Sequence, residues 1–128
     1  LIKISFNNAQ EVLSNCQMAI ITSGTATLEA MLLRTPCVTL YKTGWLTYRI
    51  VKPLLSIDNF SLPNLLAGSK LIPELLQNDV SLDNIVGAID EISLKGLEHY
   101  HKNFHLIHEN LKAGSSETAA KEIFNLVN

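Results

Sequence analysis

The chain has 128 residues, a formal net charge of −2 and a hydrophobic content of 47%. This length suits one domain, and a chain of this size buries roughly two thirds of its unfolded surface, which is ample for a packed core. The slightly acidic balance argues against bulk nucleic-acid binding. The sequence has no apolar run near the roughly 20 residues that a spanning helix needs, and its first residues do not resemble a secretory signal. Because the sequence lacks an initiator Met, we expect it to be a piece of a longer protein.

The two cysteines, Cys16 and Cys37, lie in apolar segments without a CxxC spacing. This usage is typical of reduced core residues rather than of a disulfide or a metal site. The expected location is therefore the cytoplasm.

The first part of the chain alternates between strand and helix patterns. Strands are predicted at Leu1–Phe6, Met18–Ile21 and Cys37–Tyr41, and helices at Asn8–Cys16 and Thr27–Arg34. Strands that alternate with helices at this spacing predict parallel βαβ units with helices on both faces of the sheet. The expected fold class is α/β, with a partial Rossmann-like parallel sheet.

The chain divides into a sheet part, residues 1–68, and a helical part, residues 69–128. Ser56–Gly68 is predicted to be a loop with one short strand, and Ala113-Gly114-Ser115 is predicted to separate the last two helices. The predicted helices after the first sheet strands are Thr43–Leu55, Glu74–Gln77 after Pro73, Val80–Ile92 with a Ser81 cap, Lys95–Leu111 and Ser116–Val127.

A polar stretch follows the second predicted strand in "IITSGTATLEA", Ile20–Ala30. A strand that runs through Ser, Gly and Thr into a helix places free backbone N–H groups at the carboxyl edge of a parallel sheet, where α/β proteins bind ligands and a helix N-terminus favours phosphate. Gly24 lets the backbone approach a ligand, while Ser23, Thr25 and Thr27 can cap the helix or bind phosphate. On pattern alone, an ordinary helix cap stays open.

Glu29 is the acid in this stretch. A capping box needs Ser or Thr three residues before the acid, and that position is Ala26. A helical ion pair needs a base at Leu32 or Leu33. A solvated Glu favoured by the helix dipole remains open, but a carboxylate one turn inside a phosphate-binding helix is also well placed to accept hydrogen bonds from ribose hydroxyls.

Several segments together resemble one family of enzymes. They are "SGTATLEAM", "TPCVTLYK", "SLPNLLAG", "PELLQ" and the closing "SSETAAKEIFNLV". Across nearly the whole chain they resemble the C-terminal half of the lipid-A-disaccharide synthase family, which are inverting glycosyltransferases with two Rossmann domains (the GT-B type). The resemblance implies a UDP-sugar donor site, with Ser23, Gly24 and Thr25 on the diphosphate and Glu29 on the ribose.

The resemblance also implies a reaction and its partners. The intact enzyme would transfer 2,3-diacylglucosamine from UDP to 2,3-diacylglucosamine 1-phosphate (lipid X) in lipid A biosynthesis, at the inner-membrane surface. It implies no metal or other cofactor, since the UDP-sugar is a substrate. The N-terminal acceptor domain, which would supply the general base, lies outside this chain, so the chain alone should be inactive. A homodimer through the C-terminal helices is compatible with the resemblance.

Two further residues are candidates for the same site. Asn64, in "PNLLAG", either belongs to a turn with two buried leucines or gives its amide to substrate or phosphate; the resemblance favours the second interpretation. Lys42 directly follows a predicted strand and can reach a phosphate.

Two other patterns are weaker. Between Ala30 and Ile57, bases and aromatics occur without an acid, which suits an anionic membrane interface or a phosphorylated acceptor, although aromatics in the core with solvated bases remain an alternative. Three histidines at one helical face are expected to be solvated rather than to bind zinc. The residues of the two patterns are Arg34, Tyr41, Lys42, Trp45, Tyr48, Arg49 and Lys52, and His101, His105 and His108.

Two other functional classes stay open from the sequence. A different GT-B enzyme, such as a UDP-N-acetylglucosamine transferase or 2-epimerase, would share the phosphate turn and the acid. A non-catalytic interaction module would instead use the basic, aromatic segment and the C-terminal helices to pack on a partner.

Overall fold

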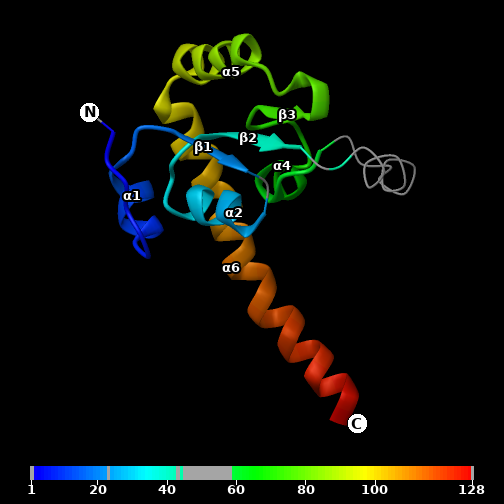
Figure 1. Cartoon of the computed structure of the whole chain (residues 1–128). Coiled ribbons are helices and arrows are strands. Elements are labelled where there is room, and N and C mark those ends of the chain that lie inside the picture. The colour runs from blue at the N-terminus through cyan, green and yellow to red at the C-terminus, as the bar shows by residue number, and fades with distance from the viewer. Residues whose placement is uncertain (1, 23, 43, 45–58, 128) are drawn as a thin grey trace.

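The centre of the molecule is a parallel sheet. The computed structural model describes residues 2–22, 24–42, 44 and 59–127, and side chains up to residue 114. Its sheet has three strands in the order β1-β2-β3 (Figure 1), with β1 at Ala19–Thr22, β2 at Cys37–Tyr41 and β3 at Glu74–Leu76. Both neighbouring pairs are parallel, so the predicted α/β class with a partial Rossmann-like sheet is confirmed.

Helices cover both faces of this sheet, as predicted. In Figure 1, α5 lies over one face, and α2 and α4 lie under the other, with α1 beside α2. The helices are α1 (Ala9–Asn15), α2 (Thr25–Leu32), α4 (Leu62–Ala67), α5 (Leu82–Lys95) and α6 (Leu97–Val127), and Gln77–Asp79 form a short 3-10 turn.

The core lies where β2 is enclosed between the helices. Cys37 and Val38 are fully buried in β2, together with Met31 from α2 and Ile92 from α5. These strand and helix residues are the apolar positions that the sequence pattern predicts to face inward.

The loop between α2 and β2 also fastens α1 to the domain. The hydroxyl of Thr35 donates a buried hydrogen bond of 2.7 Å to the carbonyl oxygen of Leu13. Leu13 is the buried residue of α1. Cys16, at the end of the same helix, is exposed, so the prediction that both cysteines are core residues is wrong for Cys16. It lies outside the core because α1 buries only the face that carries Leu13.

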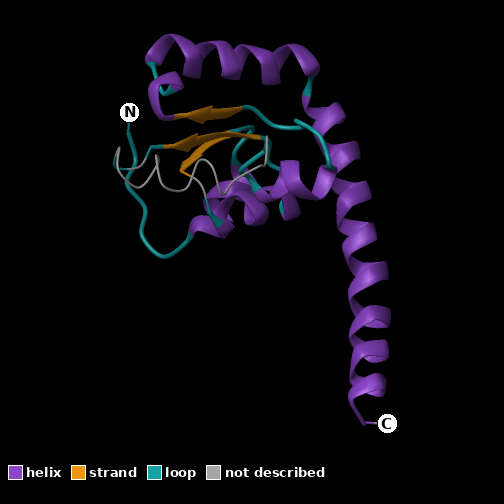
Figure 2. Ribbon diagram, turned by 90° about the vertical axis from the view of Figure 1, so that its right-hand side faces the viewer, coloured by secondary structure: helices purple, strands orange, loops and turns teal. Residues whose placement is uncertain are grey.

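The last helix is continuous, and the predicted break at Ala113-Gly114-Ser115 is wrong. Gly114 has no positive φ, whereas Gly96, which ends α5, has a φ of 79°. A glycine inside a helix costs only about 1 kcal/mol of helix stability relative to alanine. This cost alone is too small to end the helix when the glycine does not adopt a positive φ. Figure 2 shows the C-terminal half of α6 extending away from the body of the domain.

The predicted strand at Leu1–Phe6 is absent among the residues described. Residues 2–6 adopt no regular structure, and Ile2 and Phe6 are 93% and 83% exposed. A strand needs a neighbour for its backbone hydrogen bonds, and no described strand pairs with this segment. Alternating apolar residues are therefore not sufficient here to form a strand.

Two assignments after residue 55 are also wrong. Leu62–Ala67, predicted as loop or strand, is the helix α4, which Ser61 caps through the Asn64 N–H and Gly68 ends with a φ of 64°. Glu74–Leu76, predicted as helix after Pro73, is strand β3, because pairing with β2 supplies backbone partners that a four-residue helix cannot match. The sheet thus takes its third strand from beyond residue 68. The predicted helix at Thr43–Leu55 falls on residues of which only Gly44 is described.

Candidate functional site

The turn between β1 and α2 is built around Gly24. This residue is the N-cap of α2 with a φ of 137° and a ψ of −163°, and it has no side chain of its own to cap the helix. A Cβ at Gly24 would meet no atom within 4 Å, so packing does not account for the glycine. The backbone conformation does, since L side chains rarely adopt it. The result is an exposed helix N-terminus whose N–H groups can receive a ligand. Ser23, also predicted here, lies outside the described residues.

The two threonines of this turn have different surroundings. Thr25 is exposed in the first turn of α2. Thr27 is fully buried, and its hydroxyl donates a hydrogen bond of 2.8 Å to the Gly24 carbonyl oxygen. Thr25 can therefore contact a ligand directly, whereas the buried Thr27 stabilises the turn through its hydrogen bond to Gly24.

Glu29 lies one turn inside α2 and is half-buried. Within the described parts of the chain its carboxylate has no hydrogen bond and no ion pair. A half-buried acid without a partner costs solvation free energy, so a ligand that donates hydrogen bonds to it would be favoured.

Lys42 reaches the same edge from the neighbouring strand. Thr22 of β1 is in register with Leu40 of β2. Gly24 and Lys42 each follow two residues after this registered pair, so both emerge at the carboxyl edge of the sheet. Lys42 is exposed and forms no ion pair with any described acid.

Asn64 of α4 lies beside the segment that leads into β3. Its Oδ1 accepts hydrogen bonds of 2.8 Å from the N–H groups of Leu71 and Ile72, and its Nδ2 donates one of 2.9 Å to the Ile72 carbonyl oxygen. The side chain is fully buried. In this conformation the Asn64 amide anchors the segment that leads into β3, and a direct contact with substrate would require that segment to move.

Glu74 was not among the predicted site residues. Its Oε1 accepts hydrogen bonds from the N–H groups of Phe60 and Ser61, at 3.1 and 2.6 Å, and its Oε2 accepts a second one from Phe60 at 3.0 Å. The carboxylate therefore binds the backbone at the point where the chain enters α4. The sequence carries no local signal for this contact, because it joins residues 13 and 14 positions apart.

The histidines of α6 do not form a metal site in the part of the chain that is described. No group of three or more His, Cys, Asp or Glu residues lies close enough to hold an ion there. Instead, the Nδ1 atom of His105 lies 3.3 Å from the guanidinium Nη2 atom of Arg34. Among the described helices, none is long and apolar enough to cross a membrane.

Two hollows of the described surface lie beside α1. Both are lined by the N-terminal segment and α1, including Asn8 and Glu11. Neither of these two hollows includes Gly24, Glu29 or Lys42.

The chain is similar to known proteins along almost its whole length. Residues 2–126 match the family model for lipid-A-disaccharide synthetase. The chain belongs to the lipid-A-disaccharide synthetase family. It is also 38% identical over 119 residues to the lipid-A-disaccharide synthase of Idiomarina loihiensis and 36% identical over 126 residues to that of Colwellia psychrerythraea. The corresponding protein of Pseudomonas aeruginosa PAO1 is 39% identical over 119 residues.

These matches extend over almost all of this chain but over a fraction of the relatives. They include 93%, 98% and 93% of the chain, and 31%, 32% and 31% of the Idiomarina, Colwellia and Pseudomonas proteins. The chain thus spans about a third of the length of these relatives.

Proposed function

We propose that this chain is the donor-binding part of an enzyme that makes the lipid A disaccharide. The complete protein would transfer 2,3-diacylglucosamine from UDP-2,3-diacylglucosamine to lipid X and release UDP. The family membership and the names of the relatives support the reaction class. The exposed glycine turn, where an added Cβ at Gly24 would meet no atom of the described residues within 4 Å, supports the assignment of the UDP site to this edge.

Each edge residue has a role in this proposal. The N–H groups of the Ser23–Gly24–Thr25 turn bind the diphosphate, and the Lys42 ammonium balances its charge. Glu29 accepts hydrogen bonds from the ribose hydroxyls. These contacts stabilise UDP as it leaves, which is the part of glycosyl transfer that depends on charge stabilisation.

The buried polar residues of the site act through the backbone. Thr27 holds the Gly24 carbonyl, and Asn64 holds the segment before β3. The general base that removes the proton from the acceptor hydroxyl is proposed to lie in the N-terminal acceptor domain.

No metal ion or other cofactor takes part in the proposed transfer. Helix N–H groups and a lysine supply the positive charge that a divalent cation supplies in other transferases. Treating the complete protein with EDTA should leave its rate unchanged, and a loss of rate restored by Mg²⁺ would contradict this part of the proposal.

We also propose that the complete protein acts in the cytoplasm on the inner-membrane surface, where its acylated substrates reside. The bases and aromatics between Ala30 and Ile57 support this, because that stretch contains no acid. Sedimentation with vesicles tests it: binding to vesicles with anionic lipid and release at high salt are expected. Equal binding to neutral vesicles would contradict it.

Titration of the complete protein with UDP tests the donor site. We expect chemical-shift changes at the amides of Gly24 and Thr25, and a UDP affinity at least ten-fold lower for Glu29→Gln, about 1.4 kcal/mol. Glu98→Gln, an exposed acid at the start of α6, is the matched control and should bind UDP as the parent does. Unchanged affinity in Glu29→Gln would remove the acid from the site.

A further inference from the structure

We propose that Glu74 is a positioning residue for the donor-binding edge. It would act by fixing the backbone of Phe60 and Ser61 where the chain enters α4. This inference rests on the proposed function, because it assigns Glu74 to the same edge of the sheet without contact to the substrate.

The Glu74 carboxylate is held by several hydrogen bonds from the backbone. The two carboxylate oxygens make three N–H···O contacts with two successive backbone N–H groups. The shortest, 2.6 Å, is with the N–H of Ser61. Hydrogen bonds with an ionised acceptor are roughly twice as strong as neutral ones. No Lys or Arg forms an ion pair with Glu74 in the described residues, so backbone amides are the groups that balance its charge there.

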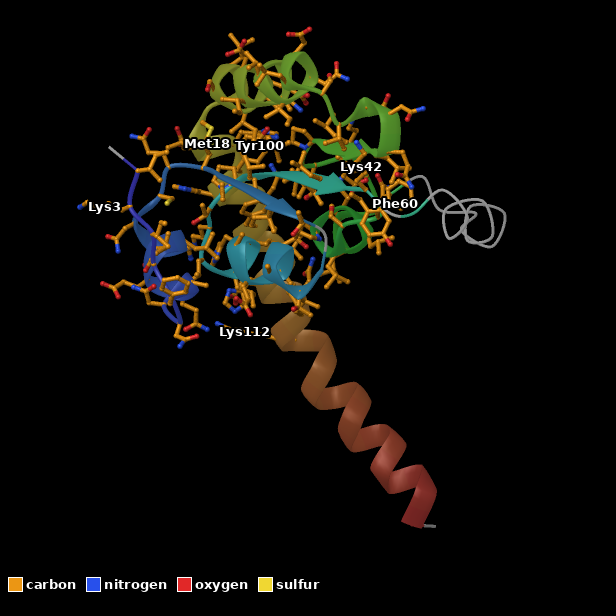
Figure 3. All side chains as sticks on the ribbon, in the orientation of Figure 1. Lys3, Met18, Lys42, Phe60, Tyr100 and Lys112 are labelled. Atoms are coloured by element: carbon orange, nitrogen blue, oxygen red, sulfur yellow. The ribbon has the colours of Figure 1, made fainter. Side chains whose placement is uncertain are left out.

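The contact between Glu74 and the backbone of Phe60 and Ser61 links β3 to the start of α4. Glu74 is in register with Thr39 of β2, three residues before Lys42. Ser61 in turn caps α4, since its hydroxyl accepts a hydrogen bond from the Asn64 N–H. The carboxylate thus joins β3, which pairs with the strand that presents Lys42, to the first residues of α4. In Figure 3, Lys42 and Phe60 both lie toward the carboxyl end of β2.

The layer between the sheet and the helices α2 and α4 contains several buried polar residues, which are costly in a core. Thr27, Thr39, Ser61 and Asn64 are at most 2% exposed, and residues in register on parallel strands share a face, so Thr39 lies on the Glu74 side. Apolar side chains of similar volume would pack there without needing partners. Of these polar residues, Ser61 and Asn64 are joined by a hydrogen bond, and satisfied buried polar groups restrict a core to one arrangement. At a ligand edge such restriction has a use, because a displacement of about 1 Å can reduce a rate by about 100-fold.

Variants of the complete protein test this role. Glu74→Gln keeps the size of the side chain, but it replaces one acceptor oxygen with a donor that opposes the backbone N–H groups. We expect kcat/KM for the UDP-sugar and the affinity for UDP to fall by about ten-fold or more. Glu74→Asp keeps the charge on a shorter side chain and should recover part of this loss. Glu98→Gln is the matched surface control and should equal the parent.

Thermal unfolding of each variant separates positioning from folding. A ten-fold loss in Glu74→Gln at a temperature where the variant is folded, with partial recovery in Glu74→Asp, supports the inference. A lower melting temperature with unchanged KM and unchanged UDP affinity would overturn it and would show a structural role only.

The proposed function has its own readout in the same experiment. If Gly24→Ala and Lys42→Ala weaken UDP binding and Glu74→Gln does not, the positioning role of Glu74 fails and the donor site stands. If none of the three substitutions changes UDP affinity, the donor site is wrong and the positioning role fails with it.

Discussion

The hydroxyl of Thr27 donates a hydrogen bond of 2.8 Å to the carbonyl oxygen of Gly24, three residues earlier. A buried side chain therefore fixes Gly24, which has a positive φ. The orientation of the N–H groups that follow Gly24 depends on this bond, and the proposed diphosphate site depends on those N–H groups.

Replacing Thr27 by Val removes this bond and keeps the shape of the side chain. We expect the free energy of unfolding to fall by about 1 kcal/mol and UDP affinity to fall by roughly five-fold, which is about 1 kcal/mol. Urea denaturation and calorimetry measure the two effects. For stability, the exposed Thr25 is the control, since Thr25→Val should change the free energy of unfolding by less than about 0.5 kcal/mol. Equal stability losses in both variants would contradict the special role of Thr27.

Replacing Gly24 by Ala tests whether the turn needs glycine for its backbone. A Cβ there meets no neighbour, so any loss comes from a φ of 137°. We expect a destabilisation of about 1–3 kcal/mol and weaker UDP binding. Gly87→Ala is the matched control, because Gly87 also has open space but lies inside α5 without a positive φ. That variant should be more stable than the parent by up to about 1 kcal/mol.

Replacing Asn64 by Ala should cost stability first. It leaves the N–H groups of Leu71 and Ile72 without their acceptor, and each unsatisfied buried group costs about 1–3 kcal/mol. We expect the free energy of unfolding to fall by about 3 kcal/mol in urea denaturation. Asn103→Ala, on the surface side of α6, should change it by less than about 0.5 kcal/mol. An Asn64→Ala protein with full stability but no activity would instead favour direct contact with substrate.

The two cysteines should differ in reactivity. Burial raises the pKa of the Cys37 thiol to about 12, so hardly any thiolate exists at pH 8. Cys16 is exposed. Iodoacetamide at pH 8, followed by peptide mass spectrometry, should label Cys16 in the native protein and Cys37 only after unfolding. Similar labelling rates for the two in the native state would contradict the buried position of β2.

The long helix α6 makes a prediction about Gly114. If the helix continues through this residue, Gly114→Ala should raise the free energy of unfolding or the helicity, by up to about 1 kcal/mol. Gly96→Ala is the contrasting variant, because a φ of 79° at Gly96 penalises any side chain. A loss of helicity in Gly114→Ala would instead indicate a helix end at that glycine.

Local signals were sufficient for the first two described strands and their helices. The apolar run Cys37–Tyr41 after Pro36 gives β2 its predicted bounds, and Ser81 caps α5 as predicted. β3 could not be predicted in this way. Its three residues fit a short helix equally well, and only pairing with β2 decides in favour of a strand.

The same distinction applies to the candidate site. The exposed residues Gly24, Thr25 and Lys42 follow from a pattern that is local to each strand end. The burial of Asn64 depends on hydrogen bonds to residues 7 and 8 positions away, and the contacts of Glu74 extend further. No window of sequence contains both partners in a recognisable spacing, so these two residues needed the structure.

The register of β1 and β2 sets a scale for the proposed site. Because Thr22 pairs with Leu40, the backbones at the ends of β1 and β2 lie about 4.8 Å apart, and Gly24 and Lys42 each follow two residues later. The position of Lys42 along the strand direction can change only in whole residues. A one-residue deletion within β2 would move Lys42 by about 3.3 Å along the strand and turn its side chain to the other face of the sheet. The strand register can therefore change the position of Lys42 only in steps of one residue. Smaller changes in the distance between its ammonium group and a ligand come from the flexible lysine side chain.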